Sequence, residues 1–228
     1  MLDLSFNAFH GTIPPSLGAL QSLLSLELSS NRLEARKPSD WSFITALTNC
    51  TSLQLLGLGD NLLEGMMPKS LVNLSTSLYF LELADNQISG IIPTEIEKLI
   101  NLTFLDMSVN DLRGTIPIEI SHLWQLQYLD LSNNMLLGEI PPTLGNLTRM
   151  DQLYLGSNEF EGDIPPTLSN INLHSADNDI AYREECVRDC MVLAFDCGLS
   201  CSSESPYERS DMTKVLKELS AARERLLS

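Results

Sequence analysis

Residues 102–117, LTFLDMSVNDLRGTIP, hold one complete copy of the unit that decides the fold. An L-x-L run is typical of a short strand, which we expect to stack in parallel on the strand of the next unit. Asn110 then turns the chain out of the strand. Its side-chain amide can form hydrogen bonds with the backbone groups that the turn leaves without a partner. Gly114 permits a tight bend, and Pro117 ends the local hydrogen bonding. The side chains predicted to point inward are Leu102, Leu105, Met107, Leu112 and Ile116.

The strand-and-asparagine phrase occurs seven times. It reads LDLSFN (2–7), LELSSN (26–31), LGLGDN (56–61), LELADN (81–86), LDMSVN (105–110), LDLSNN (129–134) and LYLGSN (153–158). The asparagines that close it are spaced 24, 30, 25, 24, 24 and 24 residues apart. A repeat of this length and pattern is typical of a leucine-rich repeat solenoid. The asparagines predicted to form a structural ladder along one edge are Asn7, Asn31, Asn61, Asn86, Asn110, Asn134 and Asn158.

A G-x-I-P element follows most of these phrases. It occupies 11–14, 90–93, 114–117, 138–141 and 162–165, with a methionine variant at 65–68. This form resembles the plant-specific class of leucine-rich repeats. The resemblance implies an α/β repeat solenoid, with short parallel strands on the concave face and extended or 3₁₀ segments on the convex side. We expect it to cover residues 1–172 in about seven repeats.

The second repeat departs from this pattern, because residues 33–54 lack G-x-I-P and the repeat is six residues longer. We predict that Asp40 caps the N-terminus of a short helix there. Cys50 is expected to be a buried free thiol. The apolar residues of the predicted helix are Trp41, Phe43, Ile44 and Leu47. The long unit is similar to one in plant receptor-like kinases that sense bacterial patterns, and the alternative is a simple convex-side insertion.

The repeat pattern stops near Asn172, and a junction is predicted over 173–182. Residues 183–228 then read as two helices, the second of them amphipathic. The stretch 198–219 resembles the last two helices of a plant receptor-like Ser/Thr kinase domain. The cysteines of this region are predicted to be buried, with a disulfide or a metal site as alternatives; they are Cys186, Cys190, Cys197 and Cys201.

Motifs for phosphoryl transfer do not occur in the sequence: there is no G-x-G-x-x-G, V-A-I-K, H-R-D, D-F-G or A-P-E. We therefore expect a kinase-dead, non-enzymatic chain without cofactor or metal. The charge pattern also argues against nucleic acid as a partner. The net charge is −16, and residues 1–174 hold 19 acidic and 7 basic residues, which would repel a phosphate backbone.

The sequence contains neither a recognisable leader nor an apolar membrane span, but it does contain glycosylation sequons. Met1 is followed directly by a repeat strand, and no stretch of apolar residues is long enough to span a membrane, so neither a leader nor a span is expected in the sequence as it stands. Four N-x-S/T sequons nevertheless favour a glycosylated extracellular protein, although they also occur as filler in such repeats. Their asparagines are Asn49, Asn73, Asn101 and Asn146.

The concave face is the predicted binding surface, because neighbours along a strand alternate faces. An aromatic run beside an acidic run is expected there, suited to an extended peptide whose Arg or Lys groups meet the carboxylates. The candidate ligand-binding residues are Tyr79, Phe80, Glu82, Phe104, Asp106, Tyr128, Asp130, Gln152 and Tyr154. The Asp column is also part of the repeat consensus, which gives it a structural alternative.

The resemblance implies a recognition module of a receptor-like kinase, with a peptide or protein ligand, a co-receptor kinase as a further partner, and the plasma membrane as the family's location. Two alternatives remain open at this point. One is a free-standing defence-type repeat protein that inhibits a pathogen enzyme, and the other is a receptor-kinase gene fragment without a function of its own.

Overall fold

The computed structural model describes residues 1–171 and 173 of the 228-residue chain. Contacts within the chain divide it into two units, Met1–Asn178 and Asp179–Ser228, and every described residue belongs to the first. The predicted helices over 183–228, the cysteines within them and nearly all of the predicted junction lie outside the described residues. The predicted domain boundaries therefore remain predictions.

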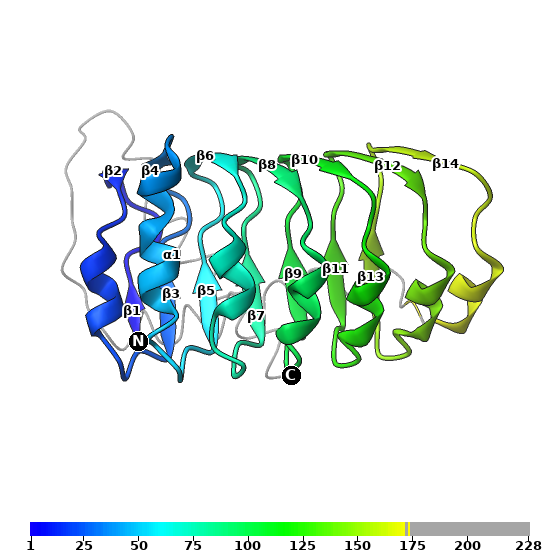
Figure 1. The fold of residues 1–228 in the computed structure, drawn as a ribbon, viewed down its shortest axis with the longest axis horizontal. Coiled ribbons are helices and arrows are strands. Elements are labelled where there is room, and N and C mark those ends of the chain that lie inside the picture. Colours follow the sequence, from blue (N-terminus) through cyan, green and yellow to red (C-terminus); the bar gives the residue numbers. More distant parts are fainter. Residues whose placement is uncertain (172, 174–228) are drawn as a thin grey trace, which may run out of the picture. The chain divides into compact units, whose positions relative to one another are not determined.

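One parallel sheet carries the L-x-L phrases, and its seven strands follow chain order (Figure 1). The strands are β1 Leu2–Asp3, β3 Ser25–Glu27, β5 Leu55–Gly57, β7 Phe80–Glu82, β9 Phe104–Asp106, β11 Tyr128–Asp130 and β13 Gln152–Tyr154. The register places equivalent residues side by side, so that Phe80 pairs with Phe104, Phe104 with Tyr128, and Tyr128 with Gln152. The predicted parallel solenoid is confirmed.

A second parallel sheet runs along the other edge of the repeats. Its strands are β2 His10–Thr12, β4 Arg32–Ala35, β6 Leu62–Met66, β8 Gln87–Ile91, β10 Asp111–Gly114, β12 Met135–Glu139 and β14 Glu159–Glu161. Most of these strands reach into the G-x-I-P element, whose glycines have φ between 77° and 95°. Such angles suit glycine because it has no Cβ. The extended convex-side segments expected from the sequence are thus joined by regular pairing.

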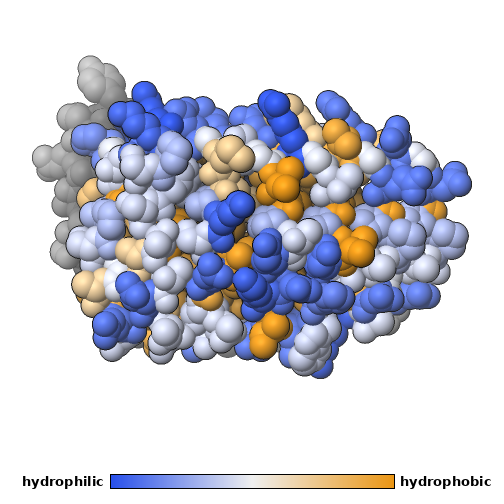
Figure 2. Space-filling view, viewed as in Figure 1, coloured by the Kyte–Doolittle hydropathy of each residue, from blue (hydrophilic) through white to orange (hydrophobic). Residues whose placement is uncertain are grey.

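Short helices complete each repeat. Seven are 3₁₀ helices: η1 Pro15–Ala19, η2 Pro38–Trp41, η3 Lys69–Asn73, η4 Thr94–Lys98, η5 Ile118–His122, η6 Pro142–Asn146 and η7 Pro166–Asn170. A proline precedes each of them except η2, in extended conformation, which sets the start of the helix. The face that carries the helices is largely polar with separate apolar patches (Figure 2).

The core lies between the two sheets and the helices, and consists mainly of leucine and isoleucine. Leu102, Leu105, Met107 and Leu112 are fully buried, as predicted, and Ile116 is 2% exposed. Because each repeat buries the same positions against its neighbours, the core is continuous along the stack.

Six of the seven asparagines that close the phrases hold neighbouring repeats together, whereas the side chain of Asn7, in the first repeat, donates to the carbonyls of Leu4 and Ser5 in its own turn. Asn110 donates from Nδ2 to the carbonyls of Met107 and Ser108 in its own turn and of Leu83 in the preceding repeat. Its Oδ1 accepts the backbone N–H of Ile88 at 2.9 Å. The same cross-repeat pattern recurs at Asn31, Asn61, Asn86, Asn134 and Asn158.

The insertion in the second repeat forms η2 followed by the one α-helix of the described residues, α1 Ser42–Leu47. The predicted role of Asp40 needs correction. Asp40 does not cap α1, which begins without a side-chain cap. Its carboxylate instead accepts the backbone N–H groups of Arg36 and Lys37, each at 3.0 Å, because η2 comes between β4 and α1. Cys50 is a buried free thiol, as predicted.

Candidate functional site

The concave sheet carries a stack of aromatic rings across neighbouring repeats. Phe80 and Phe104 stack with 4.3 Å between ring centroids and 10° between ring planes, and Phe104 and Tyr128 repeat the same geometry. Tyr154 extends the row at a tilt of 52° to Tyr128. In-register pairing of the strands places the rings in line, because equivalent positions of β7, β9 and β11 lie side by side.

This stacking changes what a ligand would meet. The faces of the inner rings are covered by one another, so the concave surface presents ring edges rather than open faces. Tyr128 is only 5% exposed, and Phe80 and Phe104 are half-buried. Tyr79, which directly precedes β7, is 43% exposed. Tyr79 is therefore the most accessible aromatic side chain of the predicted run.

The aspartates of the acidic column are nearly buried. Asp106 is 7% exposed and accepts both the backbone N–H of Ser108 at 2.9 Å and its hydroxyl at 2.7 Å. Asp130 is 8% exposed and accepts the backbone N–H of Ser132 at 2.8 Å. A carboxylate that accepts hydrogen bonds two residues further along the chain stabilises the end of its strand. The geometry thus supports the structural alternative for this column.

Glu82 differs from the aspartates because two glycines lie beside it, Gly57 on β5 and Gly59 just after that strand. A Cβ on Gly59 would collide with the Glu82 carboxylate, and one on Gly57 would collide with that of Glu27. Glu27 and Glu82 extend over this gap from opposite sides. The Ser29 hydroxyl lies 2.8 Å from Glu82 Oε2 and 3.3 Å from Glu27 Oε2, within hydrogen-bonding distance of both.

The carboxyl group of Glu27 has an altered acidity. Burial raises its pKa from 4.5 to about 8, the negative charges of Glu82 and Asp3 add to the rise, and the Ser29 hydroxyl opposes it. The candidate residues selected from sequence did not include Glu27 or Ser29. The LGLGDN phrase could have indicated this site in the sequence. Its two glycines leave space on the concave face that carboxylates from adjacent strands fill.

The remaining predicted binding residues lie at the C-terminal end of the same sheet. Gln152 and Tyr154 are both on β13 and are half-buried. The structure thus gathers all nine predicted residues on neighbouring strands of one sheet or directly beside them. They divide into buried members, Asp106, Tyr128 and Asp130, and accessible or half-buried members, Tyr79, Phe80, Glu82, Phe104, Gln152 and Tyr154.

The sequon asparagines are on the surface and lie at related places in their repeats. All four are exposed: Asn73 and Asn146 end η3 and η6, Asn49 follows α1, and Asn101 follows η4. Their places are where the chain leaves a helix to return to the concave sheet. Each predicted glycosylation site is therefore accessible from solvent.

Within residues 1–171 and 173, no group of three or more His, Cys, Asp or Glu side chains is placed to hold a metal ion. No helix in the described part of the chain combines the length and apolarity needed to cross a bilayer.

Comparison with known sequences connects these repeats to a family. The Leucine Rich Repeat profile matches residues 1–20, 77–99, 101–123 and 125–147. The receptor kinase-like protein Xa21 of Oryza sativa subsp. japonica is 47% identical over 64 residues, which are 28% of this chain and 6% of that protein. The LRR receptor-like serine/threonine-protein kinase EFR of Arabidopsis thaliana is 43% identical over 57 residues, which are 25% of this chain and 6% of that protein.

Solved structures give the same result over a longer stretch. The ectodomain of the plant receptor kinase GASSHO1/SCHENGEN3 from Arabidopsis thaliana, in complex with CASPARIAN STRIP INTEGRITY FACTOR 2, superposes with a TM-score of 0.68 and 40% identity, covering 74% of this chain and 20% of that one. The plant peptide hormone receptor RGFR1 in complex with RGF2 gives a TM-score of 0.69 and 38% identity, covering 76% and 27%.

The fold is that of a leucine-rich repeat solenoid, and the profile matches four of its segments. Its relatives include plant leucine-rich-repeat receptor-like kinases, and its structural neighbours include ectodomains of plant receptor kinases as well as a plant ice-binding protein. The relatives and the receptor ectodomains confirm the resemblance seen in the G-x-I-P repeats. The chain spans only a small part of the length of these proteins.

Proposed function

We propose that the solenoid is a recognition module that binds an extended peptide or protein segment on its concave face. The observation that carries the proposal is the preformed row of half-buried aromatic edges beside the exposed Tyr79. Aromatic side chains that are held rigidly lose little conformational freedom on binding and are enriched at recognition surfaces.

Structural neighbours support this choice of ligand class. GASSHO1/SCHENGEN3 was solved with CASPARIAN STRIP INTEGRITY FACTOR 2, and the plant peptide hormone receptor RGFR1 was solved with RGF2. HAESA was solved with the peptide hormone IDA and the co-receptor SERK1. By analogy with these proteins, a peptide ligand and a co-receptor kinase are the partners proposed for this chain. The plasma membrane, with the solenoid on its extracellular side, is the corresponding location, and the four exposed sequons are the proposed glycosylation sites.

Within this proposal the chain works by binding rather than by phosphoryl transfer. The solenoid extends over residues 1–172, residues 173–182 form a junction, and 183–228 correspond to the end of a kinase lobe. The sequence supports this division, because the kinase motifs are missing and the resemblance to a kinase domain begins only after the last repeat.

The concave face is tested with peptides selected against the full chain from a random-sequence display library. We expect the affinity of a selected peptide to fall about tenfold or more for Tyr79→Ala, because an exposed aromatic anchor is removed while the core stays intact. Isothermal titration calorimetry measures the change. Trp124→Ala is the matched control, since Trp124 is 54% exposed and lies outside the concave sheet.

Equal losses in Tyr79→Ala and Trp124→Ala would contradict the proposal, as would unchanged affinity in Tyr79→Ala. The thermal unfolding of both variants is compared with that of the parent chain, so that a loss of fold is not taken for a loss of binding. Tyr128→Ala is not suitable as a test, because Tyr128 is buried within the ring stack and its removal would leave a cavity.

A further inference from the structure

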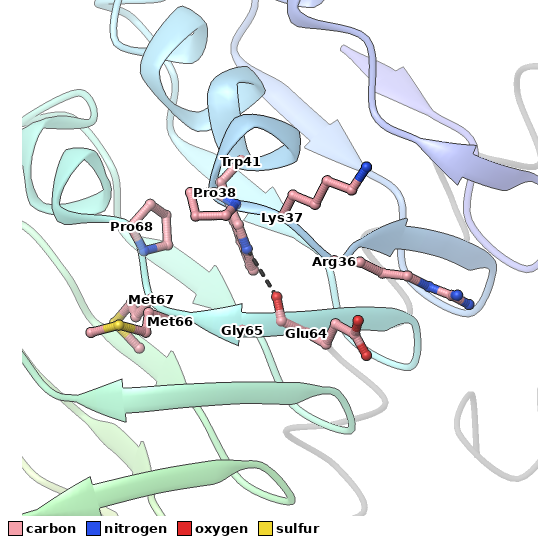
Figure 3. A pocket seen from close by; sticks show the side chains of 9 residues that line it. All are labelled: Arg36, Lys37, Pro38, Trp41, Glu64, Gly65, Met66, Met67 and Pro68. Atoms are coloured by element: carbon pink, nitrogen blue, oxygen red, sulfur yellow. Dashed lines mark hydrogen bonds between the residues drawn. The ribbon is translucent and has the colours of Figure 1, made fainter.

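A pocket of about 280 Å³ lies where the insertion of the second repeat meets β6, outside the concave sheet (Figure 3). Its apolar wall is made by Pro38, Trp41, Met66, Met67 and Pro68. Figure 3 shows the two methionines and Pro68 at one end and the cationic side chains of the η2 region at the other. The volume suits one large side chain of a partner rather than a whole small-molecule ligand.

The pocket lies over a glycine of the third repeat that is left uncovered, whereas its equivalents in the later repeats are covered. In those repeats the residue after the G-x-I-P glycine covers the glycine of the next repeat: Met66 lies over Gly90, Ile91 over Gly114, Thr115 over Gly138 and Glu139 over Gly162, each within 4 Å of an added Cβ. Over Gly65 there is nothing within 4 Å. The register of β4 and β6, continued by one residue, puts Arg36 at the covering place, but its side chain pairs with Glu34 and the space above Gly65 stays open.

The apolar wall is already in place without a ligand. Trp41 is 4% exposed, donates from Nε1 to the Glu64 carbonyl at 3.0 Å, and has its ring 5.8 Å from that of Phe43. Met66 is 75% exposed, an unusual degree for an apolar side chain beside a pocket. A rigid floor and an exposed flexible thioether together favour binding, because little has to be ordered and the methionine adapts to the shape of its partner.

Charge separates this region from the rest of the solenoid. Residues 32–69 contain four acidic and four basic residues, whereas residues 1–174 as a whole contain 19 acidic and 7 basic. Two adjacent cations, Arg36 and Lys37, line the pocket. Arg36 forms an exposed ion pair with Glu34, and Glu64 adds a carboxylate at the same end. Lys37 lies close enough to Asp40 for its charge to lower the pKa of that carboxyl group, and it is the pocket cation that remains for a negative group of a partner.

We propose that this pocket is a second docking site, separate from the concave face, for a partner protein segment in which a large apolar residue stands next to an acidic one. The apolar side chain takes the place of the missing cover over Gly65, between Pro38, Met66 and Pro68. The neighbouring carboxylate meets Lys37. The concave face takes no part in this contact, so the two sites are independent.

The test uses short capped peptides as probes with the full chain, whose methionine methyl groups carry ¹³C. The first peptide contains a Phe-Asp-Asp core. The second replaces Phe by Ala, and the third replaces both Asp by Lys. We expect the first to shift the methyl signals of Met66 and Met67 on titration, and the other two to bind at least about tenfold more weakly, since one loses the apolar burial and the other meets a cation.

Two variants locate the contact. Met66→Asp is expected to abolish the shift of the remaining Met67 methyl signal, whereas Leu137→Asp, at a 45% exposed apolar position of β12 in the same sheet, is expected to leave the shifts of Met66 and Met67 unchanged. Lys37→Glu is expected to weaken binding several-fold, and Lys98→Glu, in η4, is its control. Absence of any shift at Met66 and Met67, equal binding of the three peptides, or an equal effect of Leu137→Asp would overturn the proposal.

Discussion

Glu27 shows how strongly a single residue depends on its neighbours in this solenoid. It occupies the place in its repeat that Asp106 and Asp130 hold in theirs, yet its longer side chain reaches over Gly57 toward Glu82 instead of closing its own turn. Burial and the nearby carboxylates hold its pKa at about 8. The folded protein therefore keeps a proton on Glu27 that the unfolded chain releases.

This proton makes stability depend on pH. Glu27 has an ordinary pKa of 4.5 and a folded pKa of about 8, so between these values the folded state binds more protons than the unfolded state. The free energy of unfolding is therefore expected to fall as pH rises from 4.5 to 8, by up to about 1.4 kcal/mol per pH unit from this one group. Urea unfolding across that range measures it.

Glu27→Gln should flatten this slope, because glutamine keeps the shape and does not titrate. Glu139→Gln, at an exposed position of β12, is the matched control and should keep the slope of the parent chain. If Glu27→Gln and the parent chain lose stability in parallel between pH 4.5 and 8, Glu27 is not protonated in the folded state.

At the scale of elements, the repeat unit is held by a few residues with fixed tasks. Proline sets the start of six of the 3₁₀ helices, glycine makes the bend in the second sheet, and asparagine joins one repeat to the next. A non-glycine residue with φ between 50° and 55° precedes every ladder asparagine, for example Val109. Such backbone costs free energy, and the cross-repeat hydrogen bonds of the asparagine offset it.

Gly114→Ala tests the bend. Gly114 has a φ of 77°, and an added Cβ would lie 3.1 Å from Ile91 Cγ2, so both backbone strain and crowding oppose the change. We expect a loss of about 1–2 kcal/mol in the free energy of unfolding, measured by urea denaturation. Gly156→Ala is the control, because nothing lies within 4 Å of its added Cβ and its φ is not in the left-handed region. Equal stability of the two variants would show that this bend carries no strain.

Much of the fold could be predicted from sequence, because the same pattern of strand, asparagine turn and convex segment recurs along the chain. The strand positions, the inward residues and the convex 3₁₀ segments all follow from one phrase. The insertion was harder, since it occurs only once: Asp40 was expected to cap α1, and the intervening η2 left no signal beyond Pro38. The second sheet could not be predicted from one repeat, because its strands pair only when the repeats are stacked on one another.

The candidate site was predictable in place but not in detail. Alternation along a strand indicates which residues face the concave side, yet it does not tell which of them are covered by their neighbours. Tyr128 is covered by Phe104, and Asp106 by its own bonds to Ser108. The carboxylates above Gly57 and the open space above Gly65 both depend on the side chains of adjacent repeats, which the pattern of a single strand does not reveal.

At the scale of the described solenoid, the two proposed surfaces have different chemistry. The concave sheet combines aromatic edges with acidic side chains, and it corresponds to a regular, in-register part of the stack. The pocket above Gly65 arises where the regular stack is interrupted, and its surroundings are neutral. A chain that recognises a ligand on one surface can therefore engage a second partner on the other without competition.

If an extended peptide lies across the concave strands, site-resolved photo-crosslinking will reveal which strands it contacts. A peptide selected against the full chain is made with a benzophenone group at each position in turn, and the crosslinked residues are mapped by mass spectrometry. We expect crosslinks at Tyr79, Phe80, Phe104, Gln152 and Tyr154. The crosslinked strand should change from β7 toward β13 as the benzophenone group is moved along the peptide. Crosslinks confined to the 3₁₀ helices or to the second sheet would contradict binding on the concave face.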